Sequence, residues 1–91
     1  MQITELEWHE DLIFHVARHR VIPEEVEQVV FSSSSRVEKG RGEHVYYLTG
    51  QTEGGRYLMI VLRYLGHGKA RVITARDADG REKKRYQERR G

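Results

Sequence analysis

The spacing of the hydrophobic residues changes at about Glu43, and this change constrains the fold more than any other feature of the chain. Before it, apolar residues recur at intervals of three and four, as in helices that bury one face. After it, runs rich in β-branched and aromatic residues predict strands at Val45–Thr49, Arg56–Tyr64 and Lys69–Arg76. The sequence therefore predicts an α+β fold.

The first half of the chain predicts one short strand and two helices. Residues 2–8 alternate well enough for a strand, and His9–His19 repeats with helical spacing. Pro23 suits the first position of a second helix, and the two acidic residues that follow it lie in the first turn, where the helix dipole favours them. The serine run Ser32–Ser35 then predicts a loop.

The three later runs predict an antiparallel meander, because the glycine-containing segments TEGG and LGHG that separate them favour hairpins. The middle run, YLMIVLRYL, is apolar on both faces and should be the central strand, covered by helices on at least one side. Together with the N-terminal strand, the pattern predicts an antiparallel sheet of three to five strands.

A basic helix closes the chain. Asp79 and Glu82 occupy N-cap and N3 positions of a capping box, which predicts a helix from there to about Glu88. Its predicted exposed surface is basic and consists of Arg81, Lys83, Lys84, Arg85 and Arg89.

Length and composition exclude several classes of protein. Ninety-one residues predict a single domain, residues 1–91. The absence of cysteine excludes disulfides, thiolate nucleophiles and sulfur-ligated zinc, and fits a cytoplasmic protein. We expect no signal peptide, because acidic residues begin at Glu5, and no membrane role, because the longest apolar run, Tyr57–Leu62, is too short to span a bilayer.

Charge is distributed unevenly along the chain. Residues 1–30 carry seven acidic residues and two arginines, a net charge of −5, so the remainder carries +7. Most of that excess lies at or beyond Arg63. Such a dense positive segment attracts phosphate backbones or acidic protein surfaces, and RNA is the favoured partner. The alternative is a solvated basic face with no partner.

Arginines in the last two predicted strands are candidate phosphate ligands, because a guanidinium fork can bond two phosphate oxygens at once. Arg76 is preferred, with Arg63 as its companion. Arg71 lies five residues before Arg76, so the two point to opposite faces unless a bulge intervenes. For each arginine, an ion pair with a nearby carboxylate is the alternative interpretation.

Asp11, His15 and His19 fall at helical spacing on one predicted face. Two such histidines could bind a transition metal, and either could serve as a general base near neutral pH. A surface role is the more common outcome of such a pair, so no metal site and no cofactor is predicted. Tyr86 of the basic helix could pack its ring inward and keep its hydroxyl near the arginines.

Three segments resemble a known family. They are WHEDLIFHVARHRVIPEEV (Trp8–Val26), GRYLMIVLR (Gly55–Arg63) and RVITARDADGREKKRY (Arg71–Tyr86). In order and spacing they are similar to BrnT-type toxins, small RelE-like ribonucleases of type II toxin-antitoxin pairs. The chain departs from the family pattern at His9, where an acid is usual, at Arg20, where a glycine is usual, and in lacking the usual lysine of the first helix.

The resemblance implies a RelE-like sheet and an endoribonuclease that inhibits translation. It also implies a cognate antitoxin, expected to be of the ribbon-helix-helix type, through which alone the protein would meet DNA. The catalytic candidates that it implies by position are His19, Arg63, Arg76 and Tyr86, with Glu82 as a cap. Candidate RNA-binding residues are Arg71, Arg81, Lys83, Lys84 and Arg85.

The sequence therefore supports two alternative functions. One is a metal-independent endoribonuclease, in which His19 or Tyr86 moves protons while Arg63 and Arg76 stabilise charge on phosphorus. The other is a non-catalytic module that uses the same basic surface to bind RNA or an acidic protein segment.

Overall fold

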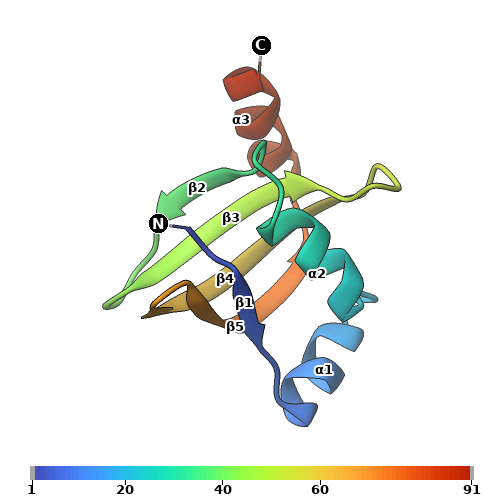
Figure 1. Cartoon of the computed structure of the whole chain (residues 1–91). Coiled ribbons are helices and arrows are strands. Elements are labelled where there is room, and N and C mark those ends of the chain that lie inside the picture. The colour runs from blue at the N-terminus through green and yellow to red at the C-terminus, as the bar shows by residue number, and fades with distance from the viewer. Residues whose placement is uncertain (1, 91) are drawn as a thin grey trace.

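One five-stranded sheet carries three helices in the computed structural model, which describes residues 2–90 and, for Arg89 and Arg90, the backbone alone (Figure 1). The side chain of Arg89, expected on the basic surface, thus lies outside the described part. The helices are α1 (Glu10–Ala17), α2 (Pro23–Val30) and α3 (Gly80–Arg90). The strands are β1 (Glu5–Glu7), β2 (Arg36–Lys39), β3 (Val45–Gln51), β4 (Tyr57–Gly66) and β5 (Lys69–Asp77).

The sheet has the strand order β1-β5-β4-β3-β2, with β4 in the middle. Strands β2 to β5 pair antiparallel, which confirms the α+β fold, the meander and the central strand. β1 pairs parallel to β5, with Leu6 beside Ala70, so the sheet is mixed. The alternation of apolar and polar residues predicts that a strand exists, but it does not predict which strand lies next to it. The sequence therefore could not predict this parallel pair.

Strand β2 was not predicted. Its sequence, RVEK, has a single apolar residue, Val37, so the alternation that identifies a half-buried strand is absent. β2 forms because β3 offers an edge to it, with Val37 opposite Leu48 and Glu38 opposite Tyr47. Tertiary pairing supplies the strand where local pattern does not.

Helix α1 ends earlier than its periodicity predicts, at Ala17 instead of His19. The turn that follows is closed by hydrogen bonds from the Arg20 and Val21 amides to the carbonyls of Ala17 and Val16, at 2.9 and 3.1 Å. These two bonds form a Schellman motif, which needs a left-handed residue, and Arg20 has φ = 60°. His19 therefore lies in a turn and not on the helix.

The two faces of the sheet are covered differently. Leu58, Ile60 and Leu62 are fully buried on the face under α1 and α2, and the helices add valines such as Val26 and Val29 to the same core. Figure 1 shows α2 in front of the sheet, α1 below it and α3 beyond the upper end. No helix in the described part of the chain has the length and apolar character needed to cross a membrane.

Helix α3 begins with the predicted capping box. The Glu82 amide donates to Asp79 Oδ1, and the Asp79 amide donates to Glu82 Oε1, both at 2.8 Å. The helix packs its single aromatic residue inward, where the Tyr86 ring meets the Tyr57 ring edge to face at 5.9 Å. Because Tyr57 alternates with the core residues of β4, α3 lies on the face opposite α1 and α2.

Gly50 of β3 should resist substitution, because an added Cβ would lie 2.9 Å from Val29 Cγ1 and closer still to Ser35 Oγ. Both neighbours are buried, and Ser35 Oγ also donates to the Val29 carbonyl at 2.7 Å. We expect Gly50→Ala to lower the free energy of unfolding by about 1–3 kcal/mol, measured by urea denaturation. Gly54→Ala, whose Cβ would meet nothing closer than 3.9 Å, should change it by less than about 0.5 kcal/mol. Equal effects would contradict the packing argument.

Candidate active site

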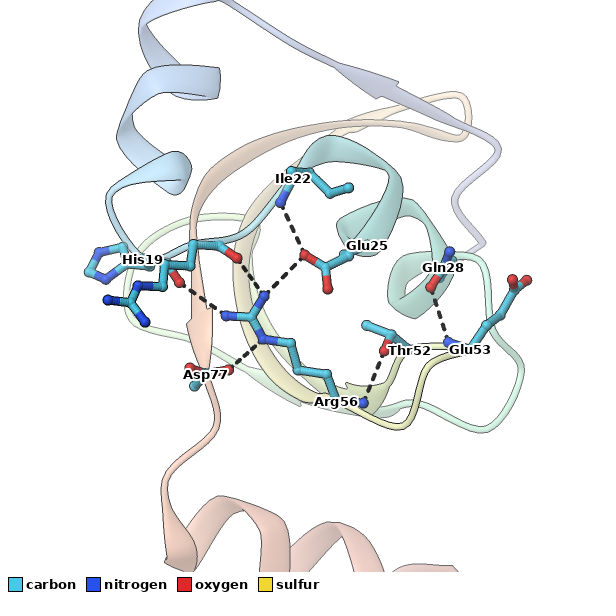
Figure 2. A network of polar contacts seen from close by, with 9 residues as sticks. His19, Ile22, Glu25, Gln28, Thr52, Glu53, Arg56 and Asp77 are labelled. Carbon is cyan, nitrogen blue, oxygen red and sulfur yellow. Dashed lines mark hydrogen bonds and ion pairs between the residues drawn. The ribbon is translucent and has the colours of Figure 1, made fainter.

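The side chain of Arg56 joins three separate parts of the fold (Figure 2). Its Nε donates to Asp77 Oδ1 at the end of β5, at 2.7 Å. Its Nη1 donates to the Arg20 carbonyl at 2.5 Å and to Glu25 Oε1 of α2 at 3.1 Å, and its Nη2 donates to the His19 carbonyl at 3.0 Å. One guanidinium group therefore fixes the α1–α2 turn relative to the sheet.

The charges around Arg56 favour this arrangement. The hydrogen bond from Arg56 lowers the pKa of Asp77, and its bonds to Asp77 and Glu25 raise its own pKa. Glu25 also accepts a hydrogen bond from the Ile22 amide at 3.2 Å, which satisfies the start of α2. Glu25 thus binds both the start of α2 and the arginine.

Beside this network the α1–α2 turn and the end of β5 enclose an open pocket of about 410 Å³. It is lined by Arg18, His19, Arg20, Arg76 and Asp77. Three guanidinium groups, one imidazole and one carboxylate make its lining strongly cationic, and four of the five residues are exposed. A phosphate group would find both positive charge and a titratable nitrogen here.

A larger hollow, of about 590 Å³, lies elsewhere and has the opposite charge. Glu24, Glu27 and Glu53 line it, together with Phe31. Carboxylates repel a polyanion, so we place the candidate active site in the smaller, cationic pocket.

Arg76 is held in this pocket by the capping residue of α3. Its Nη1 and Nη2 donate to the two carboxylate oxygens of Glu82 at 2.9 and 3.0 Å, and Nη1 also donates to the Asp77 carbonyl at 2.9 Å. The bond to Glu82 raises the pKa of Arg76. These bonds engage three of the five guanidinium N–H groups. Glu82 is thus a cap, as predicted, and an ion-pair partner as well.

The structure does not bring Arg63 to Arg76. In the β4–β5 register, Met59 lies opposite Arg76 and Arg63 lies opposite Arg71. Met59 and Arg63 are four residues apart on β4, which separates the two positions by about 13 Å. The pairing of these two arginines that the sequence favoured is therefore not formed.

A bulge decides the orientation of Arg71. The β4–β5 register shifts between Val61 and Leu62, so Ile73 is the extra residue on β5. Arg71 and Arg76 consequently face the same side of the sheet. A regular strand would have placed residues five positions apart on opposite faces. The Arg71 guanidinium donates to Glu7 from Nε at 2.7 Å, and this bond lowers the pKa of Glu7. Arg71 therefore forms an ion pair with a carboxylate, which was the alternative interpretation for each of these arginines.

The remaining candidates occupy different environments. Tyr86 is 2% exposed, so its ring packs inward as expected. The basic residues of α3 are exposed, and Lys83 Nζ lies 5.6 Å from the centre of the Tyr57 ring. These exposed residues are Arg81, Lys83, Lys84 and Arg85.

The histidine pair lies beside the pocket. The rings of His15 and His19 meet edge to face at 5.8 Å, and His15 Nε2 lies 3.0 Å from Thr74 Oγ1. Among the residues that the structure describes, Asp11 and this pair do not gather as metal ligands, and neither does any other group of three histidine, cysteine, aspartate or glutamate residues.

Sequence reasoning missed Arg56, which it assigned only to the start of a strand, and it also missed the pocket residues Arg18, Arg20 and Asp77. Its partners His19 and Arg20 lie 37 and 36 positions away in sequence, and no local pattern announces such contacts. A weak signal was present, because Arg56 lies between a glycine turn and an apolar strand, where its charge needs a partner outside the core.

The fold and the pocket define an α+β protein with a cationic site at the edge of its sheet. Comparison with solved structures gives this fold a name. The chain matches the crystal structure of the Brucella abortus ribonuclease toxin BrnT with a TM-score of 0.67 and 18% sequence identity, over 82% of this chain and 96% of that one. The chain therefore has the BrnT toxin fold. No protein-family model and no curated protein sequence matches the chain.

Removal of Arg56 should destabilise the fold, because four hydrogen bonds to three elements are lost together. We expect Arg56→Ala to lower the free energy of unfolding by about 2 kcal/mol, measured by urea denaturation. Arg36→Ala is the matched control, since the two side chains are 26% and 27% exposed and Arg36 pairs only with its strand neighbour Glu38 among the ion pairs of the described residues. The control should cost less than about 1 kcal/mol. A loss no larger for Arg56 than for Arg36 would contradict the central role of the network.

Proposed function

We propose that this protein is an endoribonuclease toxin that cleaves RNA at the pocket between the α1–α2 turn and β5, and thereby inhibits translation. The observation that carries the proposal is the pocket itself. His19 lies there with Arg18, Arg20 and Arg76, at the exposed edge of a fold shared with a ribonuclease toxin. An imidazole amid guanidinium groups suits proton transfer next to a phosphate that gains negative charge.

The proposed reaction uses the RNA's own nucleophile. The ribose 2′-hydroxyl attacks the adjacent phosphorus, its proton passes to a general base, and the bond to the 5′-oxygen of the next nucleotide breaks as that oxygen takes a proton from solvent. The products are a 2′,3′-cyclic phosphate and a 5′-hydroxyl end. His19 is the proposed base, and Arg76 with its neighbours Arg18 and Arg20 stabilises the charge on the phosphoryl oxygens. No metal ion enters this scheme.

The two other catalytic candidates take different proposed roles. Tyr86 is buried and supports α3 against Tyr57, so we assign it to the positioning of the helix that carries Glu82. Arg63 lies about 13 Å from the Arg76 position along the sheet, so we assign it to binding RNA away from the reacting phosphate.

A second candidate function is favoured by the way Arg76 is held. Its bidentate bond to Glu82 occupies the fork that would grasp a phosphate, and Tyr86 is buried. A chain in which these groups are structural would be a non-catalytic module that binds RNA or an acidic protein segment through the same basic surface. An assay of RNA cleavage distinguishes the two functions, because only the endoribonuclease would cut the RNA that it binds.

We further propose a cognate antitoxin as the protein partner. Arg76 lines the cationic pocket and is bonded to Glu82 of α3, so an acidic segment that covers both would shield the site from RNA. A ribbon-helix-helix protein encoded next to this chain would supply such a segment and would bind DNA on behalf of the pair in the cytoplasm.

His19→Ala should abolish RNA cleavage and leave RNA affinity unchanged within about twofold, because a neutral imidazole adds little to phosphate attraction. Cleavage of a labelled single-stranded RNA by the wild-type protein should persist in excess chelator. His9→Ala is the control, since His9 is also exposed but pairs with Glu7 outside the pocket. Full cleavage by the folded His19→Ala variant would remove His19 from the mechanism, and wild-type protein that binds RNA without cutting it would favour the binding module.

RNA affinity should fall steeply with salt, because contacts to phosphates release bound counterions. Each phosphate contacted by a single strand contributes about −0.7 to the slope of log affinity against log salt, so loss of three contacts should flatten that slope by about two units. The triple variant Arg81→Gln, Lys84→Gln and Arg85→Gln tests this, since all three side chains are exposed on α3. An unchanged slope would remove α3 from the RNA surface.

A further inference from the structure

One edge of the Arg76 guanidinium group is free. Its end is occupied, because Nη1 and Nη2 each donate one hydrogen bond to the carboxylate of Glu82, at 2.9 and 3.0 Å. The second N–H of Nη1 donates to the Asp77 carbonyl at 2.9 Å. The two N–H groups that remain, on Nε and Nη2, lie side by side along one edge of the guanidinium plane and have no acceptor in the described part of the chain. This edge can bond two oxygens of one phosphate.

Arg76 belongs to the candidate active site, whereas Glu82 lies outside it. Arg76 lines the cationic pocket together with His19, and Glu82 does not line it. Glu82 is therefore behind Arg76 as seen from the pocket. The Glu82 side chain is 13% exposed, against 37% for Arg76, so water has little access to the carboxylate. A phosphate in the pocket therefore approaches Arg76 from the side opposite Glu82.

Glu82 is itself fixed by the start of α3. Its Oε1 accepts a hydrogen bond from the Asp79 amide at 2.8 Å, and its own amide donates to Asp79 Oδ1 at the same distance. Buried Tyr86, whose ring contacts the Tyr57 ring, holds the helix against the sheet. A carboxylate held in this way limits the rotation of the long Arg76 side chain, which has many rotamers when it is unrestrained.

We propose that Glu82 is a positioning residue, which holds the end of the Arg76 guanidinium group so that the free edge of Nε and Nη2 meets two oxygens of a phosphate bound in the pocket. The inference rests on the proposed function and deepens it, because it fixes how Arg76 meets the phosphate before RNA binds. Preorganised donors stabilise the charge that grows on phosphoryl oxygens without reorganising during the reaction. Glu82 touches neither the RNA nor the reacting atoms.

Glu82→Gln separates the two roles of this side chain. Glutamine also suits the third position of a capping box, so the bond from the Asp79 amide is kept. Its neutral amide has one oxygen, so it cannot accept both Nη bonds of Arg76. We expect kcat for cleavage of a labelled single-stranded RNA to fall at least about tenfold, because small displacements of a catalytic group slow a reaction strongly. KM should rise less than about twofold, because loss of a carboxylate near the pocket favours phosphate binding.

Asp79→Ala is the matched control. It also removes one carboxylate near Arg76, and it breaks the other bond of the capping box, but Asp79 makes no hydrogen bond to the Arg76 side chain among those of the described residues. Its kcat should stay within about twofold of the wild-type value, at a temperature where circular dichroism shows both variants folded. A fall in kcat as large as that of Glu82→Gln would assign the effect to loosening of α3 or to loss of charge, and would overturn the proposal.

A second measurement reads the position of Arg76 without cleavage. The probe is the same RNA with fluorine in place of every 2′-hydroxyl, which removes the attacking group. Titration with this RNA should shift the ¹⁵N–¹H resonance of Arg76 Nε, which is assigned by its loss in Arg76→Lys. At saturation the shift should be equal in Asp79→Ala and the wild type, and smaller by at least about half in Glu82→Gln, because an unrestrained side chain averages over several rotamers.

The two measurements distinguish failure of this proposal from failure of the nuclease proposal. Wild-type protein that shifts the Arg76 resonance with RNA but cuts no RNA would contradict the nuclease alone. An equal shift in Glu82→Gln and the wild type would overturn the positioning role of Glu82, whether or not RNA is cut. Faster cleavage by Glu82→Gln than by Asp79→Ala would overturn it too, because Glu82 would then compete with the phosphate for Arg76.

Discussion

The hydrogen bonds of Arg56 are the interaction on which the candidate site depends. The α1–α2 turn is closed by its own backbone hydrogen bonds, but it contains a non-glycine residue, Arg20, in the left-handed region. The Arg56 guanidinium compensates by binding the carbonyls of His19 and Arg20 and anchoring them to Asp77 of the sheet. His19 reaches β5 because this bond network holds it there.

The unequal covering of the sheet explains how a chain of this size keeps a core and leaves part of one sheet face exposed. Helices α1 and α2 bury one face completely at β4, and this burial supplies the main hydrophobic stabilisation. Helix α3 then needs to cover only the end of the other face around Tyr57. The rest of that face is partly exposed, at Val61 and Arg63, and the pocket of His19 and Arg76 lies at the neighbouring edge.

The arginines of this chain differ in whether they form an ion pair with a carboxylate. Arg56, Arg71 and Arg76 are bonded to Asp77, Glu7 and Glu82, so part of their charge is satisfied within the protein. Arg20 of the turn and Arg63 of β4 are exposed and form no ion pair with a carboxylate among the described residues. Arg76 is bonded to Glu82 and also lines the cationic pocket. The same ion pair thus connects the stability of α3 with the chemistry of the site.

The sequence by itself determined the features that depend on near neighbours. Hydrophobic period predicted the two N-terminal helices and the meander, Pro23 predicted where α2 begins, and the capping box of Asp79 and Glu82 predicted α3. Tertiary structure alone decided the parallel pairing of β1, the existence of β2, the bulge that turns Arg71 to the face of Arg76, and the contacts of Arg56. The physical reason is the distance along the sequence over which each feature acts. Helix caps and hydrophobic periodicity depend on residues a few positions apart. The features that only tertiary structure decided join segments tens of residues apart, through strand pairing and ion pairs that form only in the folded chain.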